Sequence, residues 1–236
     1  MIIDHTNRRV LEVLENREKA TVLAYLRREK ESGLLASLQE VTTDMWDGYV
    51  EEVREAFDGK VAVTIDRFHV MKNFQERLDQ ARRDIQRGLS EAERAQLKGS
   101  RWLWLTNPEN LTEEKQVQLA ELKERFPSLR QLVEQREALQ GIFDNPRLKT
   151  PQQGQKRLRG WIKEVRRLGL QALEKFCQTL EHWLDKIANY FRQRSSKGAT
   201  EGFNRGLRAI LWRTGGMLNF GHFRLRVLDA FGRLKQ

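Results

Sequence analysis

The hydrophobic pattern of residues 1–65 alternates between short strand-like segments and amphipathic helices. Four segments, bounded by turn residues, are expected to form strands: 1–4, 9–14, 38–43 and 60–65. A helix is expected to run from its N-cap Asn16 to about residue 31, and Gly33 marks its end. Its expected inner face contains Ala20, Leu23, Ala24 and the stem of Arg27. The next helix carries a stripe of Tyr49, Val53, Ala56 and Phe57. Strands separated by helices predict a mixed α/β sheet.

From His69 onward the pattern predicts helices and no convincing strand. The first of these helices is long, because apolar residues recur every three or four positions at Val70, Phe74, Leu78, Ala81, Ile85 and Leu89. A polar hinge at 194–198 precedes a final helical pair, and the helices in between are expected at 112–125, 129–141, 155–168 and 170–191. The chain is therefore expected to be predominantly helical, with an α/β part at its start.

The charge of the chain favours a polyanionic partner. The 236 residues include 43 Lys and Arg against 33 Asp and Glu, a net charge of +10. Nucleic acid and anionic membranes are the usual partners of so basic a chain. No run approaches the roughly 20 apolar residues that span a bilayer, and no signal peptide follows Met1, so we expect a soluble cytosolic protein. A single cysteine, Cys177, excludes an internal disulfide and a Cys-rich zinc site.

The positive charge is concentrated in the C-terminal part. Residues 147–236 hold 20 Lys and Arg against 6 Asp and Glu, which leaves 23 against 27 for residues 1–146. Basic residues that only solvate helix faces would explain part of this excess. Phosphate contacts combined with base stacking would explain it too, because aromatic residues are interleaved with the basic ones: Trp161, Trp183, Tyr190, Phe191, Phe203, Trp212, Phe220 and Phe223. Most of these rings must also furnish the core.

Three carboxylates stand where a catalytic or metal site is expected. Asp44 and Asp66 follow predicted strands, and α/β sheets place ligand-binding groups at the carboxyl ends of strands. Asp also favours these positions as a turn former or helix N-cap. Glu201 starts a predicted helix and is the only carboxylate between Asp185 and Asp229. It could compensate the helix dipole, or bind a metal at a phosphate-binding face.

Six short motifs, in the same order, resemble the ISL-three family of bacterial insertion-sequence transposases. They are VTTDMWDGY at 41–49, IDRFHVMK at 65–72, LKGSRWL at 97–103, NPENL at 107–111, EGFN at 201–204 and NFGHFRLR at 219–226. The resemblance implies a ribonuclease H-like α/β core with a large all-helical insertion. The implied parts are a partial sheet with helices at 1–72, the insertion at 73–195, and the final helices that complete the core at 196–236.

The resemblance also implies an Asp-Asp-Glu triad that holds two Mg²⁺ or Mn²⁺ ions for DNA cleavage and strand transfer. Asp44 matches the second acid and Glu201 the third. Mg²⁺ prefers carboxylate oxygens, and two ions roughly 4 Å apart can stabilise both the attacking and the leaving oxygen of an in-line displacement. The implied partners are double-stranded DNA, as transposon ends and target, and a second copy or a full-length transposase subunit near the bacterial nucleoid.

Other residues are expected to support this site. Asp66 and His69 match an Asp-x-x-His element that supports the active-site end of the sheet or contacts DNA, and the alternative for Asp66 is an ordinary N-cap. His69 has no Cys or nearby His at metal spacing, which argues against zinc. Asn204 lies one turn after Glu201 and could orient it or bind phosphate. The residues expected to contact the DNA backbone are Arg194, Lys197, Arg205, Arg208 and Arg213.

The sequence departs from the family pattern in two places. The family's first catalytic Asp lies on a strand before the one that Met1–Asp4 matches, and Asp4 is a poor substitute, so we expect an N-terminally truncated core with weak or no activity alone. RTGGM at 213–217 replaces an RRAYGF-like run. Two alternatives remain open: an active nuclease in which another acid replaces the missing Asp, and a non-catalytic helical DNA-binding or dimerisation module.

Overall fold

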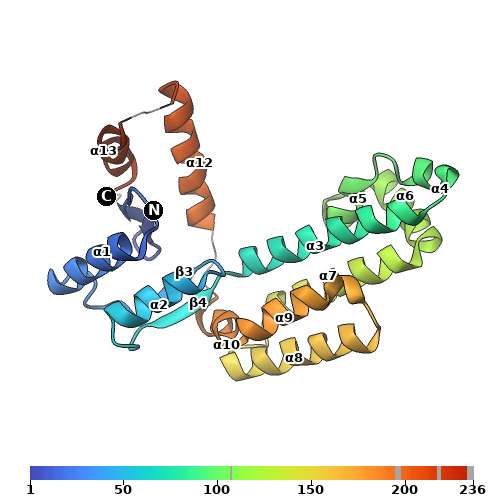
Figure 1. Cartoon of the computed structure of the whole chain (residues 1–236), viewed down its shortest axis with the longest axis horizontal. Helices are drawn as coiled ribbons and strands as arrows, with labels where there is room; N and C mark the ends of the chain where they lie inside the picture. The colour runs from blue at the N-terminus through green and yellow to red at the C-terminus, as the bar shows by residue number, and fades with distance from the viewer. Residues whose placement is uncertain (107, 195–197, 217–218, 233–236) are drawn as a thin grey trace. The chain divides into compact units, whose positions relative to one another are not determined.

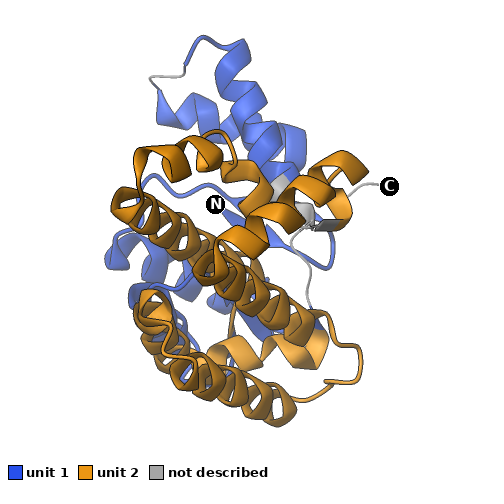
Figure 2. Cartoon of the chain, turned by 90° about the vertical axis from the view of Figure 1, so that its right-hand side faces the viewer, with its two compact units in different colours: residues 1–63, 194–236 blue, residues 64–193 orange. Residues whose placement is uncertain are grey.

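The structure is a computed structural model that describes residues 1–106, 108–194, 198–216 and 219–232. The predominantly helical character predicted from the sequence is confirmed. The chain divides into two compact units, shown in Figure 2: unit 1 comprises residues 1–63 and 194–236, and unit 2 comprises residues 64–193. The three-part division at residues 72 and 195 stays a prediction. No helix among the described residues is long and apolar enough to cross a membrane.

Four short strands appear within a residue or two of the predicted segments: β1 (Ile2–Asp4), β2 (Arg9–Glu12), β3 (Glu40–Thr43) and β4 (Ala62–Ile65). β1 and β2 form an antiparallel hairpin in which Ile3 lies opposite Val10. β3 pairs with β4 in a second two-stranded sheet. The described strands therefore form two separate sheets, and a continuous ribonuclease H-like sheet stays a prediction.

Two helices, α1 (Lys19–Glu31) and α2 (Asp47–Ala56), build the first core of unit 1. They pack together through Val22, Leu23, Tyr25, Leu26, Val53 and Ala56, with Phe57 and Val61. The predicted N-cap was wrong, because α1 begins after Glu18, and the Asn16 side chain accepts a hydrogen bond from the Glu18 backbone outside the helix. The predicted inner face was correct only for Leu23.

The last two helices, α12 (Gly198–Arg213) and α13 (Phe220–Phe231), pack with β2 in unit 1. Their core joins Val10, Val13 and Val227 to Phe203, Leu207, Ile210, Phe220, Phe223, Leu228 and Phe231. Gly206 is required there, because a Cβ would lie 2.4 Å from the Phe231 ring. Residues from the two ends of the sequence thus share one core.

Among its described residues, unit 2 contains helices and the last two residues of β4 as its regular elements (Figure 1). Its first half contains α3 (Arg67–Gly88), α4 (Glu91–Leu97), α5 (Arg101–Leu105), η1 (Pro108–Asn110), α6 (Glu113–Arg125) and α7 (Pro127–Asp144). Its second half contains α8 (Pro151–Arg167), η2 (Gln171–Leu173), α9 (Glu174–His182), α10 (Leu184–Ala188) and α11 (Tyr190–Gln193). The helix predicted at 170–191 is thus divided into four short helical segments.

Aromatic side chains fill the core of unit 2. Phe74, Trp161 and Phe176 pack edge to face, with ring centroids 5.0 to 6.0 Å apart. Phe143 stacks on Phe191, which also touches Gly154 so closely that a Cβ there would lie 2.1 Å from the ring. These rings are buried and therefore cannot stack on DNA bases. In unit 2, the aromatic residues that lie between basic ones in the sequence belong to the core.

Candidate functional site

Asp44 lies directly after β3, as the sequence predicts, and its side chain is half-buried. Among the described residues, its carboxylate accepts one long hydrogen bond of 3.4 Å from the Thr43 hydroxyl and forms no ion pair. Its backbone carbonyl accepts a hydrogen bond of 3.0 Å from the Trp46 amide, which turns the chain into α2. The backbone of Asp44 is thus held at the strand end, where the chain turns into α2.

The residues that follow Asp44 form a tight aromatic turn. Trp46 packs edge to face on Tyr49 with ring centroids 4.4 Å apart, and the Arg17 guanidinium lies 5.6 Å from the Trp46 ring. A Cβ on Gly48 would lie 2.7 Å from the indole, so only glycine allows the ring to cover this position. Local packing next to Asp44 therefore explains Trp46, Gly48 and Tyr49 of the first motif.

Glu52 on α2 is a buried carboxylate that the sequence pattern does not reveal. Its side chain is fully buried, and neither oxygen has a hydrogen-bond partner within the described part of the chain. Burial raises the pKa of Glu52, against the opposing charge of Lys19. Burial also raises the pKa of Tyr49, and the charges of Asp44 and Glu52 add to this shift. Tyr49 therefore lies within electrostatic reach of both carboxylates.

The other predicted acid, Glu201, lies in the first turn of α12, and its side chain is outside the described part of the structure. The shared metal site of Glu201 and Asp44 therefore stays a prediction. Asn204 follows one turn later and is exposed. No group of three or more His, Cys, Asp or Glu side chains among the described residues could hold a metal ion.

The exposed face of α12 combines basic and aromatic residues. Arg205, Arg208 and Trp212 follow one another at spacings of three and four, which places them on one side of the helix. The opposite side packs into the core through Phe203, Leu207 and Ile210. Trp212 is 84% exposed, the most exposed of the large apolar residues described. Arg213 is also exposed, at the end of the helix.

The predicted hinge at 194–198 contains two of the residues expected to contact DNA, Arg194 and Lys197. Arg194 is half-buried and has a backbone φ of +48°, a left-handed conformation that marks a sharp turn after α11. Lys197 lies outside the described residues. Both residues remain candidates for DNA contact by sequence alone.

Asp66 and His69 belong to unit 2, where they form the start of α3. Asp66 is the N-cap, because its carboxylate accepts a hydrogen bond of 2.9 Å from the Phe68 amide. His69 donates its backbone N–H to the Asp66 carbonyl at 3.0 Å, and its half-buried ring lies edge to face against Phe68. Arg67 ties this start to Asp144 and to the Tyr190 hydroxyl. The N-cap alternative for Asp66 is therefore confirmed.

Asp4 is occupied by the hairpin turn that it closes. Its carboxylate accepts hydrogen bonds from the backbone and the side chain of Asn7, at 3.0 and 2.6 Å, and from Arg9 at 3.4 Å. Burial favours the neutral acid, but these hydrogen bonds outweigh it and lower the pKa of Asp4. The structure thus gives Asp4 a role in the turn.

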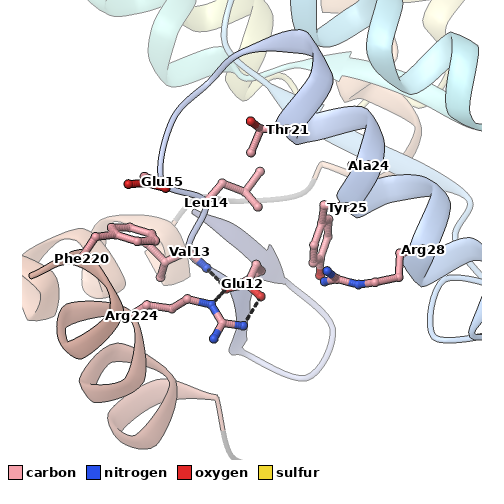
Figure 3. Close-up of a pocket in the computed structure, with 10 residues that line it drawn as sticks. All are labelled: Glu12, Val13, Leu14, Glu15, Thr21, Ala24, Tyr25, Arg28, Phe220 and Arg224. Carbon is pink, nitrogen blue, oxygen red and sulfur yellow. Dashed lines mark hydrogen bonds and ion pairs between the residues drawn. The ribbon is translucent and has the colours of Figure 1, made fainter.

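A cavity of about 350 Å³ opens elsewhere in unit 1, between the end of β2, α1 and α13 (Figure 3). None of the predicted site residues lines it; its lining includes Glu12, Leu14, Tyr25, Arg28, Phe220 and Arg224. Arg224 holds the buried Glu12 through two hydrogen bonds of 2.6 and 2.5 Å. The NFGHFRLR motif is partly explained here, since Arg224 makes this ion pair and Asn219 caps α13.

Comparison with known proteins gives one family and one relative. A family model described as a transposase, of the Asp-Asp-Glu ISL-three type, matches residues 1–227. The transposase for insertion sequence element IS1001 of Bordetella parapertussis is 26% identical over 234 residues, which is 98% of this chain and 56% of that protein. The chain thus spans about half the length of this relative. No solved structure matches the chain.

Proposed function

Because the chain belongs to the ISL-three family of transposases, we propose that it forms the metal-binding and DNA-binding part of an enzyme that cleaves and joins DNA at insertion-sequence ends. The observation that carries the proposal is Asp44: a half-buried carboxylate at a strand end, with no cation beside it among the described residues. The motif at 41–49, which resembles the family's motif around the second acid, supports the assignment.

Of the two proposed metal ligands, Asp44 is described, and its chemistry fits a hard divalent ion. Asp44 offers carboxylate oxygens, which Mg²⁺ and Mn²⁺ prefer, and we propose Glu201 as the second protein ligand. When bound, the ions would activate water or a 3′-hydroxyl and stabilise the leaving oxygen. The hydrogen bond from the Trp46 amide fixes the backbone of Asp44, so the carboxylate would be presented to the metal from the end of β3. A ribonuclease H-like arrangement would bring α12 to this strand end.

We assign the DNA contacts of this site to the exposed face of α12. Arg205 and Arg208 would bind backbone phosphates, and Trp212 would stack on a base or sugar beside them. Asn204 would orient the Glu201 carboxylate or bind a phosphate, while Arg194, Lys197 and Arg213 would extend the contact. The partners are duplex DNA, as transposon end and target, and a second copy or full-length subunit.

We further propose that phosphoryl transfer by this chain alone is weak. Asp4 is engaged by Asn7 and Arg9 in its turn, which disfavours it as the first acid of the triad. A metal pair that lacks one shared ligand would bind less tightly and would stabilise the transition state less well. The second candidate function, a non-catalytic DNA-binding module, is favoured by the basic and aromatic face of α12 taken without the acids.

The proposal is tested by Mn²⁺ binding, followed by electron paramagnetic resonance. Asp44→Asn should weaken Mn²⁺ binding at least about tenfold, because it removes one charged ligand. Glu51→Gln is the matched control, since it removes an exposed carboxylate of α2 and should leave the affinity unchanged. Equal Mn²⁺ affinities for wild type and Asp44→Asn would refute the metal assignment and leave the DNA-binding module.

Nicking of the element's terminal-repeat DNA separates the remaining alternatives. We expect the wild-type chain to bind this DNA and to nick it weakly or not at all with Mg²⁺ or Mn²⁺. Strong nicking that Asp44→Asn and Glu201→Gln abolish would show a complete active site and contradict the weak activity. Strong nicking that neither substitution affects would contradict the roles of both acids.

A further inference from the structure

The longest stretch of unopposed positive charge in unit 2 lies on and just before α8. Between residues 145 and 163 the sequence contains six Lys and Arg and no Asp or Glu. The six are Arg147, Lys149, Lys156, Arg157, Arg159 and Lys163, and all of them are exposed. α8 itself lies along one edge of the helical unit (Figure 1). Four of the six cations lie on α8 itself, and the other two lie in the segment just before it.

The helix divides its residues cleanly between two faces. The inner face is buried through Gly154, Leu158, Trp161, Ile162 and Val165. At 100° per residue, Lys156 and Lys163 lie almost directly opposite this face, with Arg159 beside them. We call Lys156, Arg159 and Lys163 the α8 stripe. It covers about 10 Å along the helix at 1.5 Å per residue.

The cations of the α8 stripe have no carboxylate partners among the described residues. In contrast, the two arginines at the end of the same helix are neutralised: Arg166 pairs with Glu174 and Glu181 at 2.9 and 2.7 Å, and Arg167 pairs with Glu164 at 2.7 Å. The helix therefore carries paired charge at one end and unpaired charge along its middle. Unpaired cations aligned on a rigid helix cost self-repulsion, which an anionic partner would relieve.

A glycine lies within the stripe. Gly160 is exposed in the middle of α8, and a Cβ there would meet nothing within 4 Å. Glycine weakens a helix interior relative to alanine, and nothing in the described packing requires it at this position. The missing side chain lets a partner come close to the helix backbone between Lys156 and Lys163.

We propose that the α8 stripe is a second DNA-binding surface, which holds the phosphate backbone of a DNA duplex against the helix. Aligned point charges without an exposed aromatic ring suit phosphates rather than bases, so the contact would be independent of sequence. The choice of duplex DNA as the polyanion rests on the proposed function. The surface would anchor DNA on the helical unit, independently of the acids of unit 1.

The test compares two triple variants of the full chain in binding to a random-sequence duplex. Lys156→Gln/Arg159→Gln/Lys163→Gln should lower the affinity roughly a hundredfold at 0.1 M salt and reduce the salt slope by about three, because each lost phosphate contact removes nearly one unit of slope. Lys98→Gln/Lys115→Gln/Arg125→Gln is the matched control, with the same loss of charge from exposed, unpaired positions of unit 2. Its salt slope should stay within about one unit of the wild type.

A substitution at Gly160 gives a second test, in which weaker DNA binding cannot be caused by misfolding because the Tm is expected to rise. Gly160→Ala should raise the Tm and at the same time weaken DNA binding several-fold, because the added methyl group stiffens the helix but obstructs the backbone. Gly141→Ala is the control, since Gly141 is also an exposed glycine inside a helix, with nothing within 4 Å of a Cβ. It should raise the Tm and leave binding unchanged.

Each contrary result has a distinct meaning. Equal weakening by the two triple variants would show a response to net charge alone and overturn the α8 stripe, while leaving the proposed function intact. Wild-type affinity of the Lys156→Gln/Arg159→Gln/Lys163→Gln variant would also overturn the α8 stripe and leave the proposed function intact. Wild-type chain that binds vesicles of anionic lipid more tightly than DNA would overturn duplex DNA as the occupant. Absence of any DNA binding at low salt would overturn both the stripe and the proposed function.

Discussion

Unit 1 buries two glutamates in opposite environments. Glu12 at the end of β2 is 6% exposed and receives hydrogen bonds from Arg224 and the Val13 amide. Glu52 on α2 is fully buried and has no hydrogen-bond partner in the described structure. Burial raises the pKa of both, but the partners of Glu12 reverse the direction and leave its pKa lowered, while the pKa of Glu52 stays raised.

The charge of Glu12 stabilises the fold, whereas the charge of Glu52 lowers the free energy of unfolding. The Glu12 and Arg224 pair joins residues 212 positions apart in the sequence, so it ties β2 to α13. Glu52 contributes no such link, and its ionisation at neutral pH opposes folding. The structural role of a buried carboxylate therefore depends on its partners, and the first core tolerates an unsatisfied carboxylate whose charge reaches Tyr49.

The largest effect is expected from Arg224→Met. It leaves Glu12 buried without its cation and should lower the free energy of unfolding by about 2–3 kcal/mol, a value reduced from that of a fully buried pair because Arg224 is 39% exposed. Urea denaturation measures the loss. Arg226→Met, at an exposed position of the same helix, is the control and should change stability by less than about 0.5 kcal/mol. Equal losses for the two variants would remove the special role of the pair.

The opposite sign is expected from Glu52→Met. Replacing the unsatisfied carboxylate by an apolar side chain of similar size should raise the free energy of unfolding at pH 7 by about 1–2 kcal/mol. Glu51→Met, on the exposed side of α2, should stay within about 0.5 kcal/mol of wild type. If Glu52→Met destabilises the protein instead, Glu52 has a partner in solution and the contrast with Glu12 fails.

The two glutamates should also differ in pH dependence. Glu12 has a lowered folded-state pKa, so its contribution is present above the unfolded pKa and is lost as the pH falls through the folded pKa. Glu52 has a raised folded-state pKa, so its cost appears as the pH rises from the unfolded value through the folded one. The gain from Glu52→Met should therefore shrink on acidification. Unfolding curves between pH 3 and 7 measure it, and a gain that is independent of pH contradicts the raised pKa.

The smallest effect is expected at two tyrosines. Removing the charge of Glu52 should lower the pKa of Tyr49, because that charge adds to the effect of burial. Glu12→Gln should leave Tyr49 unchanged and act on Tyr25, whose pKa burial raises to about 12, with the charges of Glu29 and Glu12 adding to the shift. NMR titration of labelled tyrosine rings measures both. A response of Tyr49 to Glu12→Gln would contradict this assignment of neighbours.

Local pattern predicts part of this structure well. The strands and the long α3 follow from alternation and apolar spacing, and the strand-end position of Asp44 follows with them. The N-cap of α1 was wrong because Asn16 forms a hydrogen bond in the loop before the helix. The whole of unit 2 could be predicted as helical, but its core could not, because a buried ring and a DNA-stacking ring look alike in sequence.

Long-range pairing explains the remaining failures. Glu52 was missed because a charged residue in an amphipathic helix is expected on the exposed side. The structural role of Arg224 depends on a partner at the other end of the sequence, which no local spacing reveals. Asp66 allowed both a site role and a capping role, and only the hydrogen bond from Phe68 shows that it caps α3.

The most direct test of the metal site is a double-mutant cycle of Mn²⁺ affinity with Asp44→Asn, Glu201→Gln and the double variant. If the two carboxylates share one metal site, each single substitution should weaken binding at least about tenfold, and the double variant should lose much less than the product of the two effects. Effects that multiply, or no effect of either substitution, would show that Asp44 and Glu201 do not act on the same metal and would contradict the proposed transposase site.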